Sequence, residues 1–470
     1  MPTTFVCADE PQIALFDDDV VAIPGLCREP GRVGQFVDGI DRVVLLLHPD
    51  KYDIPTVQRA LRSIDVDPLG AQIMDVRDEV DPCDLVASVA GLQARATAFR
   101  ASKPEQAKPM LPNAVTRRGF LRPPAPSYMA APAITQKTCA AGNGCRACVD
   151  VCPRGAYRWN AGRISYDKDL CLPCGQCVTA CPTGSIENPS LTPPMLEAQV
   201  KSVIEASLDP VGLRFVCSRG SVTPRTAWID ISVPCTSMVP ATWLIACLLL
   251  GSGGAYAVPC GESGCDLDLD GGAVGSNSLA RALLEEVGFD ANCVDGVTVG
   301  IPLPGVHMDG MFDGRRAAKV FAALTEVAER PILVDHGSSP LGIVEIDVDT
   351  CTLCGQCAKS CPTSALIETY EGDTVSLSFD ATSCVNCGQC ALSCPEVERG
   401  AIAVAGRVDS RLITSDPIEL NTGDVATCEL CGTAIAPASM MERIGSLLGD
   451  EFEATIGVLA NRCLDCRGRL

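Results

Sequence analysis

The sequence predicts a mixed architecture, in which α/β domains with parallel sheets are interrupted by small cysteine-rich α+β modules. Short apolar runs alternate with helical patterns in residues 1–100 and 191–335, as is typical of a parallel sheet with helices. Most of the 29 cysteines fall in tight C-x-x-C runs outside these two segments. Such runs indicate metal ligation in a reducing compartment rather than the disulfide framework of a secreted protein.

Composition and charge exclude several classes of protein. The chain has 470 residues, a formal net charge of −21 and 4% aromatic residues, so its cores are expected to be aliphatic. No basic face is visible for nucleic acid. The N-terminus lacks the pattern of a signal peptide, so a cytoplasmic location is expected. The apolar run Met238–Val258 is broken by Pro240 and three glycines, which predicts a buried helix and strand and no membrane span.

The order of these patterns along the chain predicts six segments. They are an α/β domain at 1–100, a Pro/Ala-rich linker at 101–135, a cysteine module at 136–190, a second α/β domain at 191–335, a second cysteine module at 336–406 and a four-cysteine knuckle at 420–470.

Secondary structure is predicted in detail only for the two α/β domains. Ile54–Ile64 and Pro193–Leu208 have helical spacing, and Thr192 is expected to cap the second helix. The predicted strands are Thr3–Val6, Val20–Ile23, Val43–Leu47 and Ala71–Val76 in the first domain, and Val211–Val216, Trp228–Val233 and Ala255–Val258 in the second.

Four cysteine runs carry the strongest chemical signal. Residues 171–182, 351–362 and 384–395 follow C-x2-C-x2-C-x3-C-P, and residues 139–153 follow C-x5-C-x2-C-x3-C-P. This pattern resembles the bacterial ferredoxin domain with two [4Fe–4S] clusters. Three closely spaced cysteines wrap one corner of a cubane, and the fourth serves the neighbouring cluster.

The resemblance implies four [4Fe–4S] clusters in crossed sets of ligands. The sets are Cys139, Cys145, Cys148 and Cys181; Cys171, Cys174, Cys177 and Cys152; Cys351, Cys354, Cys357 and Cys394; and Cys384, Cys387, Cys390 and Cys361. Zinc is the alternative, but sixteen cysteines in four runs exceed its usual two C-x-x-C pairs.

The second α/β domain has cysteines after each predicted strand. Cys217, Cys235 and Cys260 follow successive strands, with Cys265 in the last loop, so a parallel sheet would deliver all four to its carboxyl edge. The strings FVCSRG, SVPCTS and VPCGESGC resemble the delta subunit of methyl-viologen-reducing hydrogenase. That family carries a [2Fe–2S] cluster and passes electrons from a hydrogenase or dehydrogenase to a heterodisulfide reductase.

Other residues of this domain qualify that resemblance. Gly220 replaces a second cysteine that the family usually has, which leaves the four cysteines for one [2Fe–2S] cluster. The alternative is that they are ordinary buried thiols. Cys247 and Cys293 are expected to belong to the core.

The N-terminal domain shows the same arrangement at the ends of its strands. Cys7, Cys27, His48 and Cys83 follow the four strands, and GLCREPGRV, DRVVLLLHPDKYDIPTVQRALRSIDVDP and DVRDEVDPC resemble the N-terminal region of the A-type subunit of heterodisulfide reductase. His48 stands where that family has a cluster cysteine. The domain holds either a three-Cys, one-His cluster or no cluster and a structural role. No flavin is expected, because only residues 101–135 separate it from the first module.

The C-terminal segment contains two C-x-x-C pairs, Cys428 with Cys431 and Cys463 with Cys466. They predict a structural Zn²⁺ site of the zinc-ribbon type, and similar tails occur in hydrogenase and formate dehydrogenase ferredoxin subunits. A rubredoxin-like iron is the alternative, because it uses the same four thiolates.

These features predict an electron-relay subunit of a heterodisulfide reductase or hydrogenase/formate dehydrogenase type of complex. Its expected partners are other redox subunits, namely a flavoprotein, a hydrogenase or dehydrogenase, or a heterodisulfide reductase-like protein. The alternatives are an oxidoreductase with its own cluster-based active site and a non-catalytic redox sensor. Three histidines and no nucleophile motif argue against a separate active site.

Overall fold

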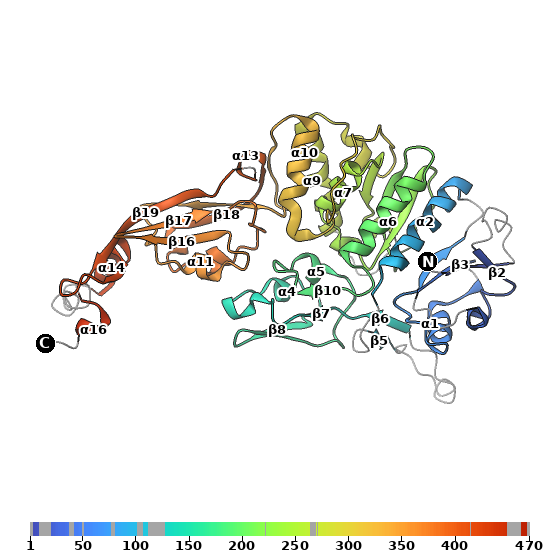
Figure 1. Cartoon of the computed structure of the whole chain (residues 1–470), viewed down its shortest axis with the longest axis horizontal. Coiled ribbons are helices and arrows are strands. Elements are labelled where there is room, and N and C mark those ends of the chain that lie inside the picture. Colours follow the sequence, from blue (N-terminus) through green and yellow to red (C-terminus); the bar gives the residue numbers. More distant parts are fainter. Residues whose placement is uncertain are drawn as a thin grey trace. The chain divides into compact units, whose positions relative to one another are not determined.

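The computed structural model describes residues 3–8, 20–36, 42–48, 51–76, 80–100, 107–110, 127–220, 222–263, 269, 271–413, 415–448 and 462–467 (Figure 1). The chain divides into two compact units. The first unit comprises Met1–Cys139, Cys148–Arg158 and Ile164–Arg330; the second comprises Ala140–Ala147, Trp159–Arg163 and Pro331–Leu470. Each unit is described by itself below.

The N-terminal domain is a four-stranded parallel sheet with helices on both faces. The strands β1 (Thr3–Cys7), β2 (Val20–Ile23), β3 (Val43–Leu47) and β4 (Gln72–Asp75) have the order β2-β1-β3-β4. Along β3, alternate residues face opposite sides: Val43, Leu45 and Leu47 pack with α1 (Ile54–Arg62), and Val44 and Leu46 pack with α2 (Pro82–Ala98). An uninterrupted apolar strand is therefore required here, because both of its faces are covered.

The second α/β domain has a three-stranded parallel sheet. Its strands are β11 (Gly212–Cys217), β12 (Trp228–Val233) and β13 (Gly254–Ala257), in the order β12-β11-β13. The helical elements are α6 (Pro193–Ala206), η6 (Thr236–Met238), α7 (Ala241–Leu249), α8 (Cys260–Ser263), α9 (Gly271–Val287), η7 (Ala291–Val294), η8 (Gly314–Arg316) and α10 (Ala317–Ala328). All nine residues of α7 are buried, as expected for the apolar run that includes it.

Helices α2 and α6 join the two α/β domains within the first unit, where they lie side by side (Figure 1). The helices approach closely at Gly91, because a methyl group there would overlap Cγ2 of Val203 and lie 3.2 Å from the Gln199 carbonyl oxygen. The buried Arg95 side chain also reaches the second domain, where Nη1 donates to Ser232 O at 2.9 Å and Nη2 to Ser190 O at 3.0 Å. The domains therefore share one packed interface.

The first cysteine module consists of short elements around long loops. They are η5 (Ala140–Asn143), α4 (Ala147–Asp150), β8 (Tyr157–Asn160), β9 (Arg163–Tyr166), α5 (Gln176–Thr179) and β10 (Ile186–Glu187). The segment 101–135 was expected to be a linker, but its described residues form β5 (Ala107–Met110), β6 (Ser127–Ala130) and β7 (Ala133–Ile134). The sequence predicts no strands there because each is short and pairs locally, β5 with β6 and β7 with β10.

The second unit is built on antiparallel strands. One sheet has the order β14-β18-β15, with β14 (Leu333–Asp335), β15 (Gly342–Ile346) and β18 (Ile402–Asp409); the other has the order β16-β17-β19-β20, with β16 (Leu366–Glu371), β17 (Thr374–Phe379), β19 (Ile418–Thr427) and β20 (Ala434–Pro437). The helices are α11 (Gln356–Ser360), α12 (Gln389–Ser393), η9 (Val397–Arg399), α13 (Ser410–Ile413), α14 (Ala438–Leu448) and α16 (Leu464–Arg467).

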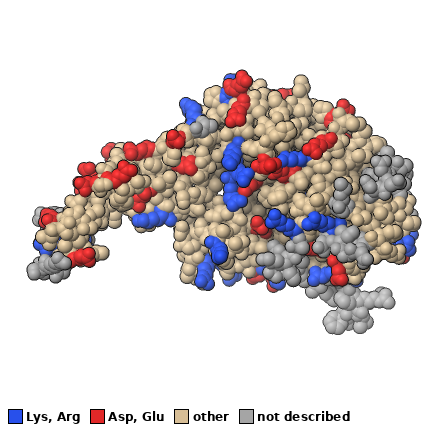
Figure 2. Space-filling view, viewed as in Figure 1, with Lys and Arg blue, Asp and Glu red and all other residues tan. Residues whose placement is uncertain are grey.

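Two further expectations can be compared with the fold. Thr192 occupies the N-cap position of α6, but its side chain makes no capping hydrogen bond. No helix in the described part of the chain is both long and apolar enough to cross a lipid bilayer. Acidic side chains gather along the second unit (Figure 2), and its exposed acidic residues include Glu345, Asp347, Asp349, Glu371, Asp373, Glu398, Asp416, Glu419, Asp424 and Glu429.

Candidate metal centres

Each C-x-x-C-G-Q-C segment folds into a loop followed by one short helix. The glycines Gly175, Gly355 and Gly388 precede α5, α11 and α12 with φ values of 73°, 69° and 68°. Glycine suits this left-handed conformation because it lacks a Cβ. The third cysteine of each run then lies in the first turn of the helix, and the fourth follows the end of the helix. The local sequence thus turns three thiols toward one space and the fourth away from it.

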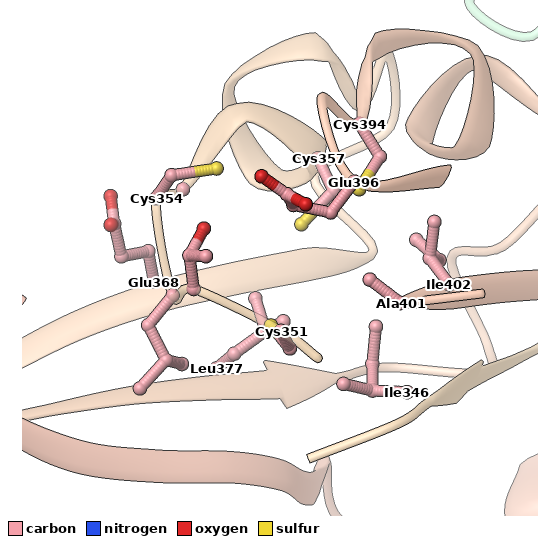
Figure 3. A pocket seen from close by; sticks show the side chains of 13 residues that line it. Ile346, Cys351, Cys354, Cys357, Glu368, Leu377, Cys394, Glu396, Ala401 and Ile402 are labelled. Carbon is pink, nitrogen blue, oxygen red and sulfur yellow. The ribbon is translucent and has the colours of Figure 1, made fainter. Parts of the chain in front are cut away.

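Three of the four predicted sets of cysteines each surround a single cavity. Cys351, Cys354, Cys357 and Cys394 surround a space of about 430 Å³, together with Ile346, Leu377 and Ile402 (Figure 3). The sets Cys152, Cys171, Cys174 and Cys177, and Cys361, Cys384, Cys387 and Cys390, each line a cavity of about 320 Å³. In every case the fourth thiol comes from the other run of its module. The structure therefore brings these twelve thiols together in crossed groups.

The remaining predicted set is less closely grouped. Cys145 and Cys148 are buried, whereas Cys139 is only half-buried. Cys181 lines a separate cavity of about 640 Å³ with Trp243 and Arg315. The longer gap between Cys139 and Cys145 accommodates η5, which replaces the tight loop of the other three runs.

The environment of these thiols suits metal-bound sulfur. Burial, followed by the charges of neighbouring cysteines, raises the pKa of Cys357 and of Cys390 to about 12. In Cys177, burial also raises the pKa to about 12, against a hydrogen bond from Tyr157 that lowers it. Buried thiols this close together repel one another as thiolates, so they need a cation to compensate their charge. An iron–sulfur cluster fits the donor set.

A carboxylate that the sequence does not mark out also lines the cavity in Figure 3. Glu396 accepts hydrogen bonds from Nη1 of Arg399 at 2.7 Å and from Nε of Arg443 at 3.0 Å. These arginines hold the pKa of Glu396 below its usual range. Arg443 belongs to α14 and is 47 residues distant, so no local pattern could have predicted the pair.

The second α/β domain places three predicted cysteines at one edge of its sheet. Cys217 ends β11, Cys235 follows β12 and Cys260 begins α8 after β13; they are 2%, 0% and 1% exposed. A hydrogen bond from Cys217 is the main cause that lowers the pKa of Cys235, whose Sγ also lies 3.0 Å from Oγ of Ser237. Cys265 lies outside the described residues. Cys247 and Cys293 are buried in α7 and η7.

The N-terminal candidates are distributed differently. Cys7 and Cys27 pack in the apolar core on the α1 side of the sheet, and the backbone N–H of His48 donates to Sγ of Cys27 at 3.3 Å. Cys83 is exposed in the first turn of α2, where Asp81 caps its N–H at 2.8 Å. Cys83 therefore belongs to the start of a helix rather than to a strand end.

The C-terminal knuckle brings its four sulfurs together. The ligand atoms of Cys428, Cys431, Cys463 and Cys466 lie within 4.8 Å of one another, and no other such group occurs among the described residues. Sγ of Cys431 is 3.6 Å from that of Cys463 and 3.7 Å from that of Cys466. Four thiolates in a tetrahedron around Zn²⁺ would lie about 3.8 Å apart. The donor set therefore fits a tetrahedral ion.

Comparison with known proteins agrees with this geometry. Residues 138–185 and residues 343–395 each match a family of 4Fe–4S dicluster domains. A probable iron–sulfur protein of the Frd operon in Proteus vulgaris, described as one of its subunits, is 41% identical over 59 residues, which are 13% of this chain and 37% of that protein. An uncharacterized ferredoxin of Methanocaldococcus jannaschii is 40% identical over 47 residues, or 9% of this chain and 61% of the relative.

The chain thus spans less than two thirds of either of these relatives, and the matches lie in short segments. Taken with the cysteine-lined cavities, the two domain matches establish the general class of this molecule. It is an iron–sulfur protein with two 4Fe–4S dicluster domains of the ferredoxin type.

Proposed function

We propose that this chain is an electron-relay subunit of a larger redox complex, of the heterodisulfide reductase or hydrogenase/formate dehydrogenase type. The observation that carries the proposal is the crossed grouping of thiols around three cavities. Two dicluster modules in one chain suit the passage of electrons along the polypeptide. Their cavities are lined by cluster cysteines and apolar side chains, which leaves little room for a substrate.

Within the modules, four [4Fe–4S] clusters would be held by the four crossed sets of cysteines. When bound, each cluster would accept and release one electron at a time. The protein supplies cysteine sulfurs, apolar walls and backbone donors, such as the N–H of Ala365, which donates to Sγ of Cys361 at 3.2 Å. Hydrogen bonds of this kind stabilise negative charge on sulfur and tune the potential of a cluster.

Two further centres belong to the proposal. Cys217, Cys235, Cys260 and Cys265 would hold a [2Fe–2S] cluster, supported by the meeting of three of them at one sheet edge. The knuckle would hold a structural Zn²⁺ ion. The N-terminal domain would be structural, because two of its candidate cysteines pack in an apolar core and the third is exposed.

The surface of the second unit supports a role beside other redox proteins. Its exposed acidic side chains form a negative surface (Figure 2) that would attract partners with basic patches. The relative from Proteus vulgaris is itself described as an iron–sulfur subunit.

The test is to purify the full-length chain under anaerobic conditions and to measure iron, sulfide and EPR spectra after reduction with dithionite. Four [4Fe–4S] clusters require about sixteen iron atoms per chain, and a [2Fe–2S] cluster raises this to about eighteen. The reduced protein should pass electrons to a one-electron acceptor but show no turnover of a substrate by itself. Colourless protein that contains zinc alone would refute the proposal.

A further inference from the structure

In the first unit, helix α5 of the first module packs against η6 of the second α/β domain. Gly175, which caps α5, faces Met238, the last residue of η6. A methyl group at Gly175 would overlap Sδ of Met238 and lie 2.9 Å from its Cε and 3.3 Å from its Cβ. Met238 is 1% exposed, so it has little space in which to move. The absence of a side chain at Gly175 therefore allows this close approach.

Each side of this contact is attached directly to a candidate ligand. Cys174 precedes Gly175 in the loop that lines the cavity of the second predicted set. Cys235 caps η6, and the N–H of Met238 donates to Cys235 O at 3.2 Å. Burial raises the pKa of Cys174, and the nearby negative charge of Cys235 raises it further. The two thiols thus lie within electrostatic range of each other.

The position of η6 is itself restricted. A methyl group at Gly272, at the start of α9, would overlap the Ser237 carbonyl oxygen and lie 2.8 Å from Cα of Ser237. Backbone therefore packs on backbone at this point. With α9 on one side and α5 on another, η6 has little freedom to shift away from the first module.

We infer that the contact between Gly175 and Met238 is an electron-transfer junction, which holds the centre of Cys152, Cys171, Cys174 and Cys177 directly beside the centre at Cys217 and Cys235. This inference rests on the proposed function. One electron would leave the reduced centre and enter the oxidised one, with no bond formed or broken and no proton moved. A low-potential one-electron donor, such as a partner iron–sulfur protein or dithionite, would supply the electron.

The other two C-G-Q-C glycines provide a comparison within the same chain. A side chain at Gly355 would meet the Glu368 carboxylate, and one at Gly388 would have no neighbour within 4 Å. Gly175 and Gly388 have similar positive φ values, 73° and 68°. A substitution at either one therefore strains the backbone equally, but only the substitution at Gly175 pushes against Met238.

The experiment compares the full-length holoprotein with the Gly175→Leu variant and the matched control Gly388→Leu. EPR power saturation and line shape of the [2Fe–2S] signal are recorded after partial and full reduction with dithionite. In the wild type, full reduction should broaden this signal and speed its relaxation, because a second paramagnet lies beside it. Gly175→Leu should lose this interaction, and Gly388→Leu should keep it.

The wild-type spectrum decides the question even if Gly175→Leu fails to retain its clusters. A [2Fe–2S] signal that relaxes as an isolated centre would overturn the junction and leave the relay function intact. The same conclusion follows if Gly175→Leu keeps its iron and the full interaction. Iron content that stops at about sixteen atoms per chain, with no [2Fe–2S] signal, would instead remove the middle centre and the junction together.

Discussion

Three of the crossover cysteines accept the same backbone hydrogen bond. The N–H groups of Ala156, Ser185 and Ala365 each donate to the Sγ of the cysteine four residues earlier, at 3.2 Å. These cysteines are Cys152, Cys181 and Cys361, and each is followed by proline. The repeated bond fixes the direction of the thiol away from its own run, because the chain must turn back after the proline to supply the donor.

Crossed and uncrossed ligand sets predict different iron losses in double variants. Under the crossed arrangement, Cys361→Ser with Cys384→Ser affects one cluster and should remove about four iron atoms per chain. Cys361→Ser with Cys351→Ser affects two clusters and should remove about eight. Iron analysis of the anaerobic proteins makes the measurement. The reverse order of losses would show that each run binds its own cluster.

At the level of elements, the crossing of α2 and α6 depends on one glycine. Glycine within a helix is usually about 0.5–1 kcal/mol less stable than alanine. At Gly91 we expect the opposite sign, because the new methyl group would overlap Val203 and crowd Gln199. Gly91→Ala should destabilise the first unit by about 1–3 kcal/mol, as overpacking does. Anaerobic calorimetry would measure the change in melting temperature.

Gly445 is the control for that substitution, because it lies within α14 and a side chain there would have no neighbour within 4 Å. Gly445→Ala should be neutral or stabilising by about 0.5–1 kcal/mol. If both variants stabilise the protein, the packing of α2 on α6 is looser than the structure indicates.

The C-terminal knuckle is the second element with a direct test. Cys431→Ser removes one of four thiolates that lie within 4.8 Å of one another, so the protein should lose about one zinc ion per chain. Mass spectrometry of the metals would detect the loss. Cys83→Ser, at an exposed position on α2, should leave both zinc and iron unchanged. A rubredoxin-type visible spectrum in the wild type would identify iron as the metal of the knuckle.

At the level of the whole molecule, Arg95 connects the two α/β domains. Burial lowers its pKa to about 10, which still leaves the guanidinium charged at neutral pH. Arg95→Ala would leave the Ser190 and Ser232 carbonyl oxygens without this donor and should cost about 3 kcal/mol of stability. Anaerobic thermal unfolding would measure this loss. Arg59→Ala, at an exposed position on α1, should change the stability by less than about 0.5 kcal/mol. Equal effects of the two substitutions would contradict this role.

Local patterns were enough to predict many elements of this chain. β2, β3 and β12 have the predicted bounds, and both predicted α/β segments contain parallel sheets, because strand and helix periodicity is set by neighbouring residues. The cysteine runs likewise specify their own loops, since three ligands and a glycine lie within seven residues. Metal sites of this kind are visible in sequence because the chain forms them locally.

The contacts between elements depended on packing between distant parts of the chain. Met238 against Gly175, Arg443 beside Glu396 and the strands formed within 101–135 join residues with no common local pattern. Cys83 also left its expected strand end, because Asp81 and Pro82 start α2 before it. Ligand identity is thus a property of short segments, whereas the route between centres depends on which surfaces the folded chain presses together.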